Sequence, residues 1–266
     1  MHRVRSKDGT PIAYDRMGDG PAVILVGGAT FDRSGNARLA GELAKDFTVY
    51  NYDRRGRGDS GDGLPYALER EIEDIGVLAA EAGGAPHVYG VSSGGALAME
   101  AAAAGVPMGR LAVYEVPYDV AGDAEQRHRA YAETLEALLA EGRRGDAFAL
   151  FMRTAGAPDD DIAAARNSPM WAGLEAIAHT LAYDAACLGD GRPPAHRLAT
   201  IAQPTLVATG GASAGTFVGG GGDFFGDAAA AIAASIPHAE RRSVEGQTHS
   251  VDPAVLAPIL AEFLGR

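Results

Sequence analysis

A sharp turn between a short strand and a helix is the feature that most constrains the fold of this chain. His87-Val-Tyr-Gly-Val91 is an apolar run of the kind found in buried strands, and it leads directly into Gly90-Val-Ser-Ser-Gly94. The small residues from Ala96 to Ala104 then predict a helix. A strand that runs straight into a helix is the repeating unit of sheets with parallel strands, so the chain is expected to be an α/β protein.

Strands and helices alternate along much of the chain, as parallel sheets require. Around Asp8-Gly9, a hairpin is expected to pair residues 2–5 with 11–16. Further strands are expected at residues 22–26, 47–52, 87–91, 111–116, 204–209 and 240–244. Helices are expected at residues 37–45, 67–83, 96–104, 226–235 and 253–264. This order predicts a mostly parallel sheet with helices on both faces.

Residues 118–200 have a different character, because they show helical periodicity and no convincing strand. Apolar residues at helical spacing mark residues 124–141, and residues 146–154 and 170–188 are similar. The segment predicts an inserted cap of three or four helices over a core made of residues 1–117 and 201–266. The glycine-rich segment 210–222 predicts a loop, with a lid near the site as the alternative.

Composition and charge exclude several classes of protein. The chain has 266 residues and 47% hydrophobic residues, enough for one structural unit with a large core. Its net charge of −12 disfavours a nucleic-acid partner, and no basic run favours a membrane surface. The single cysteine, Cys187, cannot form an internal disulfide. Without an apolar segment after the charged start or a run of about 20 apolar residues, a cytoplasmic protein is expected.

Ser92 is the predicted nucleophile. A residue on so sharp a turn has strained backbone geometry, and glycine two positions to either side leaves room for it. The turn lifts the hydroxyl clear of the sheet and directs the free N–H groups of the following helix toward it. The alternative is an inert serine in a glycine-rich turn.

A serine hydroxyl needs a base, and His249 is the predicted one. Of the seven histidines, His249 alone lies in a loop between the last predicted strand and the last predicted helix. There its side chain can reach over the sheet edge to Ser92.

The acid that orients the histidine has three candidates. The place after strand 204–209, where an acid is usual, contains no carboxylate. Glu115 is preferred, because it ends the strand that follows the nucleophile helix. Asp119 and Asp223 stay open as alternatives, as does a purely structural Glu115.

An oxyanion hole needs two preorganised N–H donors. The turn supplies the N–H of Ser93. The loop after strand 22–26 is expected to supply the other from Ala29, or from Gly28 beside it.

Several segments together resemble the α/β-hydrolase superfamily. Val26-Gly-Gly-Ala29 is similar to its oxyanion loop, with Gly27 in place of the usual histidine. Asp53-Arg-Arg-Gly-Arg-Gly-Asp-Ser60 is similar to its D-x-R-G-x-G-x-S loop, and Gly90–Gly94 to its nucleophile elbow. Tyr114-Glu-Val-Pro117 resembles the Y-E-P-P segment of a bacterial subgroup. Glu115 also resembles, in position, the acid of haloalkane dehalogenases, but a serine nucleophile disfavours dehalogenation and epoxide hydrolysis through an alkyl-enzyme.

The resemblance implies a serine hydrolase that acts on a carboxylic ester or related acyl compound through Ser92, His249 and Glu115. Its substrate would be a small molecule, and neither a metal nor an organic cofactor would be needed. The missing acid after strand 204–209 motivates an alternative, a non-hydrolytic cyclase, lyase or acyl transferase of small-molecule biosynthesis. A binding protein without activity is disfavoured, because both Ser92 and His249 are present. The sequence indicates no particular oligomeric state.

Overall fold

In this computed structural model, which describes residues 1–212 and 223–266, the strands form one mixed sheet. The strand order in the described residues is β1-β2-β4-β3-β5-β6-β7-β8. The hairpin strands β1 and β2 are antiparallel to each other and β2 is antiparallel to β4, whereas all pairs from β4 to β8 are parallel. The bounds are β1 His2–Arg5, β2 Pro11–Met17, β3 Ala22–Val26, β4 Thr48–Tyr52, β5 His87–Val91, β6 Leu111–Tyr114, β7 Thr205–Gly210 and β8 Ala239–Val244.

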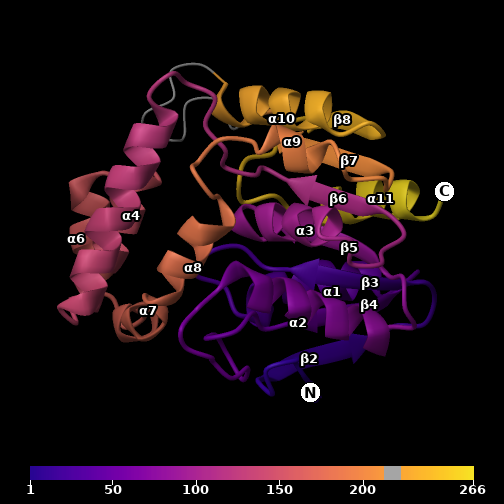
Figure 1. Ribbon diagram of the computed structural model, residues 1–266, viewed down its shortest axis with the longest axis horizontal. Coiled ribbons are helices and arrows are strands. Elements are labelled where there is room, and N and C mark those ends of the chain that lie inside the picture. The colour runs from indigo at the N-terminus through magenta and orange to yellow at the C-terminus, as the bar shows by residue number, and fades with distance from the viewer. Residues whose placement is uncertain (213–222) are drawn as a thin grey trace.

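Helices cover both faces of this sheet (Figure 1). One apolar core contains residues of α1 (Ala37–Leu43) and α11 (Pro253–Leu264), and it includes Val23 and Leu25 of β3. The other core contains residues of α2 (Leu68–Glu81), α3 (Ser93–Ala103) and α10 (Phe224–Ser235), and it includes Ile24 and Val26. Successive side chains of a strand point to opposite faces, which is why the wholly apolar run of β3 serves both cores.

Every regular element between β6 and β7 is a helix. These are α4 Ala124–Ala140, α5 Arg144–Thr154, α6 Asp159–Arg166, α7 Trp171–Ile177, α8 Thr180–Cys187 and α9 Ala195–Leu198. In Figure 1, α4, α6, α7 and α8 lie together to one side of the sheet. Together with α5, these helices share a separate apolar cluster that includes Leu135, Phe148 and Trp171. The assignment of residues 118–200 as a cap stays a prediction, with this cluster in its favour.

The structure corrects several predicted bounds. The helix after the turn begins at Ser93 instead of Ala96, and Ser92 occupies its N-cap position without a capping hydrogen bond from its side chain. Strand β6 ends at Tyr114, since Glu115 has a positive φ of 47° and leaves the extended conformation. Residues 170–188 form two helices, and the segment 118–200 contains six helices where three or four were expected. A short 3-10 helix, Arg33–Asn36, also precedes α1.

The predicted glycine-rich loop lies mainly outside the described residues, which omit 213–222. Within the described part of the chain, none of the helices has the length and apolar character needed to span a membrane.

Candidate active site

Ser92 occupies a strained turn at the carboxyl end of β5. Its φ of 55° and ψ of −129° are unfavourable for any residue with a side chain. The turn is tight: a Cβ on Gly90 would lie 2.5 Å from the carbonyl oxygen of Gly94. A Cβ on Gly94 would lie 2.5 Å from the carbonyl oxygen of Val26 and closer still to that of Gly27. The two glycines are therefore required by close approach of backbone to backbone.

Glu115 contacts His249 at the same edge of the sheet. The His249 Nδ1 and the Glu115 Oε2 are 2.9 Å apart, and the backbone N–H of Gly210 donates to Oε1 at 2.7 Å. Glu115 is only 2% exposed, and each of its carboxylate oxygens has a partner, as a buried carboxylate requires. The sequence-predicted base and the preferred acid are thus brought together.

The other two acid candidates have structural partners. Asp223 caps α10, where its carboxylate accepts from the N–H of Gly226 at 3.0 Å. Asp119 pairs with Arg127 and accepts from the N–H of Ala121 at 2.9 Å. Of the three candidates, Glu115 is the one with a contact to His249.

Two aromatic residues hold the loop that carries His249. The hydroxyl of Tyr114 donates to the carbonyl oxygen of Thr248 at 2.7 Å. The ring of Phe225 stacks on the imidazole of His249, with centroids 5.0 Å apart and planes 10° apart. The imidazole is therefore held by a hydrogen bond at its edge and by a ring against its face.

The predicted oxyanion residues approach Ser92 from two sides. Ser93 begins α3 and is buried. Across from it, Gly28 is so close that a Cβ there would lie 3.1 Å from the Cβ of Ser92. The next residue, Ala29, lines the same cavity as Ser92. Both predicted sources of N–H groups thus lie beside the predicted nucleophile.

Ser92 and His249 open into a cavity of about 920 Å³. Its wall combines the sheet edge with side chains of α4 and α5, including Tyr131 and Phe151. A cavity of this size and lining accommodates a small organic molecule. Among the described residues, no cluster of histidine, cysteine and acidic side chains is suited to hold a metal ion.

Comparison with known proteins shows the family. The model of the alpha/beta hydrolase family matches residues 23–259. The solved structure of an alpha/beta hydrolase from Sphaerobacter thermophilus DSM 20745 is 50% identical, covers 98% of this chain and 99% of its own, and superposes with a TM-score of 0.84. The chain belongs to the alpha/beta hydrolase family.

More distantly similar solved structures share the same fold. A thermophilic esterase from Thermogutta terrifontis, solved with malate bound, is 23% identical over 100% of this chain and 98% of its own, with a TM-score of 0.71. The enol-lactonase from Burkholderia xenovorans LB400 is 20% identical over 100% of both chains, with a TM-score of 0.69. No curated protein matches this chain.

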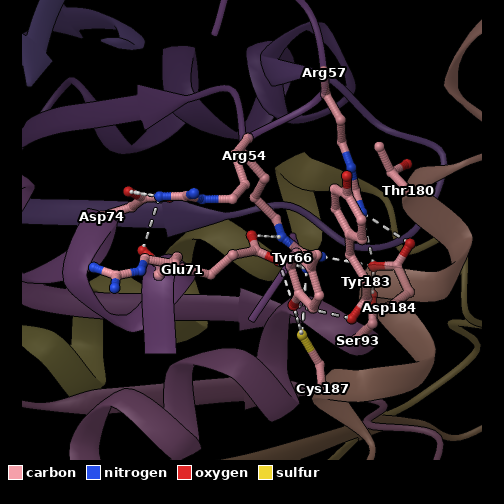
Figure 2. A network of polar contacts seen from close by, with 12 residues as sticks. Arg54, Arg57, Tyr66, Glu71, Asp74, Ser93, Thr180, Tyr183, Asp184 and Cys187 are labelled. Atoms are coloured by element: carbon pink, nitrogen blue, oxygen red, sulfur yellow. Dashed lines mark hydrogen bonds and ion pairs between the residues drawn. The ribbon is translucent and has the colours of Figure 1, made fainter. Parts of the chain in front are cut away.

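Three arginines of the loop after β4 are buried in this alpha/beta hydrolase, although arginine is rarely found inside a protein. Arg55 forms two hydrogen bonds to Asp74, both 2.8 Å long. Arg54 forms two to Glu71, at 2.8 and 2.7 Å. Arg54 and Arg57 also converge on Asp184 of α8 (Figure 2). The arginines therefore serve internal ion pairs.

Asp184 was missed as a site residue by sequence reasoning, because it belongs to no motif and reaches the site only through the fold. Cys187 is buried beside Arg54, and burial raises the pKa of its thiol to about 12.

Proposed function

We propose that this protein is a serine hydrolase that cleaves a carboxylic ester or related acyl compound through an acyl-enzyme on Ser92. The observation that carries the proposal is the hydrogen bond between buried Glu115 and His249, whose imidazole lines the same cavity as Ser92. Glu115 would accept a hydrogen bond from Nδ1–H of His249, which keeps the proton of the neutral imidazole on Nδ1 and leaves Nε2 unprotonated and able to act as base.

The first half of the reaction forms the acyl-enzyme. The Ser92 Oγ attacks the carbonyl carbon while its proton passes to Nε2 of His249. The negative charge that develops on the substrate oxygen is stabilised by the N–H groups of Ser93 and of Ala29, or of Gly28 beside it. When the tetrahedral intermediate collapses, the bond to the alkoxy group breaks, and the alcohol leaves with the proton from His249.

The second half releases the acid. A water molecule attacks the acyl carbon and gives its proton to His249, and the bond to Ser92 Oγ then breaks as the serine regains that proton. The side chains of these residues supply every proton transfer, so the reaction requires no metal or organic cofactor. The largely apolar cavity favours an apolar acyl or alcohol group.

Two measurements on one pair of proteins test the proposal. Wild type and Ser92→Ala are treated with a fluorophosphonate probe, and turnover of short- to long-chain p-nitrophenyl esters is measured. We expect labelling at Ser92 and a loss of kcat of at least about 10³-fold in Ser92→Ala, because no other group replaces the nucleophile. Ser235→Ala, in which a serine at the end of α10 is changed, is the matched control and should keep wild-type activity.

Wild-type protein that neither reacts with the probe nor cleaves any ester would contradict the proposal. Labelling of Ser92 without ester hydrolysis would favour acyl transfer to another acceptor, the alternative raised by the sequence.

A further inference from the structure

Asp184 is a buried carboxylate that links α8, one of the helices between β6 and β7, to the turn at Ser92. It lies on α8 and is 5% exposed. Its Oδ1 accepts hydrogen bonds from Arg54 at 2.7 Å, from Arg57 at 2.8 Å and from the hydroxyl of Ser93 at 2.7 Å. Figure 2 shows the side chains of Arg54, Arg57 and Ser93 converging on Asp184.

The charge of Asp184 is maintained by its neighbours. Burial by itself raises the pKa of this carboxyl group, but the guanidinium groups of Arg57 and Arg54 outweigh burial, and the pKa lies below its usual value. Asp184 is therefore ionised at neutral pH and can hold both arginines.

Arg57 extends the link to the opposite side of the site. Its Nη2 donates to Asp184 Oδ2 at 2.8 Å, and its Nη1 donates to the carbonyl oxygen of Gly28 at 2.6 Å. Because the peptide between Gly28 and Ala29 is trans and planar, its C=O and N–H point in opposite directions. By holding the Gly28 oxygen on the buried side, Arg57 directs the Ala29 N–H away from itself.

We infer that Asp184 positions both N–H donors of the proposed oxyanion hole, Ser93 directly and Ala29 through Arg57. Asp184 is a positioning residue that acts through these two neighbours. The inference rests on the proposed function. The contacts of Asp184 also couple the packing of α8 to stabilisation of the transition state, because the carboxylate reaches the site only when α8 is packed against the core.

The test compares Asp184→Asn with Asp74→Asn. Asp74 is the control because it is also a buried carboxylate, 1% exposed, that accepts two hydrogen bonds from an arginine, Arg55. In the described structure it makes no hydrogen bond to the loop at Gly28. We expect Asp184→Asn to lower kcat for a p-nitrophenyl ester by about 10-fold or more while KM changes little, since a donor that is misplaced costs less than the 10²–10³-fold of one that is removed. Asp74→Asn should lose stability but retain its kcat.

A double-mutant cycle adds a readout that a general loss of stability would not move. Ser93→Ala keeps the backbone N–H but removes the hydroxyl that donates to Asp184. Combined with Asp184→Asn, it should lower kcat by less than the product of the single effects. Equal losses of kcat in Asp184→Asn and Asp74→Asn, or fully multiplicative effects in the cycle, would overturn the inference.

Hydrogen exchange separates this inference from the proposed function, because it needs no turnover. Backbone amides of residues 27–31 should exchange faster in Asp184→Asn than in wild type or Asp74→Asn. If no ester is cleaved by wild type, the proposed function fails, while the exchange measurement still decides whether Asp184 orders this loop. Unchanged exchange in Asp184→Asn would refute the positioning role.

Discussion

Two residues with strained backbones lie side by side at the carboxyl edge of the sheet. In the pairing of β5 with β6, Val91 lies opposite Tyr114, so Ser92 and Glu115 directly follow the ends of two neighbouring strands. Both have positive φ angles, 55° and 47°, which cost about 1–3 kcal/mol each for residues other than glycine. The fold tolerates this strain at two adjacent strand ends. There the positive φ angles turn both side chains away from the directions that an extended strand would give them.

At the residue scale, Glu115→Gln tests the assignment of the acid. An amide at this place can donate to Nδ1 of His249, which favours the wrong tautomer and leaves Nε2 protonated. We expect kcat to fall by about 10²–10⁴-fold with little change in stability. Steady-state kinetics on the preferred p-nitrophenyl ester measures the effect, and Asp223→Asn should retain activity. Near-normal turnover of Glu115→Gln would show that the acid lies elsewhere.

The turn around Ser92 is an example of two elements that must pack backbone to backbone. Helix α3 approaches the end of β3 so closely that position 94 has no space for a methyl group beside the carbonyl oxygens of Val26 and Gly27. The same approach keeps the Gly28 loop next to Ser92. Small residues in this part of α3 therefore set the spacing between the two sides of the proposed oxyanion hole.

At the element scale, Gly94→Ala should destabilise the protein. The added methyl group must displace backbone, and overpacking of this kind costs about 1–3 kcal/mol. Urea unfolding followed by circular dichroism measures the change. Gly41→Ala is the matched control: this glycine lies in α1 with open space around it, so alanine there should be neutral or stabilising. A Gly94→Ala protein as stable as wild type would show that the elements can separate without cost.

His87 is harder to protonate in the folded protein than in the unfolded chain. Burial lowers the pKa of His87, and the positive charge of Arg110 lowers this pKa further. The Nδ1 of His87 also accepts a hydrogen bond from the N–H of Arg110 at 3.1 Å. The folded protein therefore binds fewer protons at this site than the unfolded chain, whose histidine titrates near pH 6.5.

At the scale of the whole molecule, stability should fall as the pH falls below about 6.5, because the unfolded chain then takes up a proton that folded His87 does not. The loss stops once the pH passes the lowered pKa of the folded state. Thermal melts between pH 7.5 and 5 should show a smaller decrease in Tm for His87→Asn than for wild type. The exposed His196→Asn serves as the control. An identical pH dependence in wild type and His87→Asn would exclude this contribution.

The sequence predicted the parts of the fold that are encoded locally. Strands 22–26 and 87–91 and helix 253–264 have the expected bounds, because an apolar run with glycine or proline at its ends specifies each of them. The alpha/beta hydrolase family was also predictable from the sequence, because its motifs are short and have fixed spacing.

Other parts of the site depend on contacts that no local pattern encodes. Asp184 meets Arg57 across 127 positions of sequence, and Phe225 reaches His249 from the start of α10. The break between α7 and α8 in segment 170–188 was missed as well, since one helical periodicity continues across it. Side chains far apart in sequence were predictable only where strand ends bring them to one edge, as for Ser92, Glu115 and His249.

The ion pairs of Asp184 also limit how this protein can be rebuilt. An engineer who wished to exchange the helices between β6 and β7 for those of a relative, in order to change the cavity, would remove the carboxylate that neutralises Arg57. Arg54 would retain Glu71, but of the two hydrogen-bond partners described for its side chain, Arg57 would keep only the carbonyl oxygen of Gly28. This helical segment is therefore not interchangeable: a successful graft has to carry an acidic residue to the place of Asp184, or Arg57 has to be replaced with it.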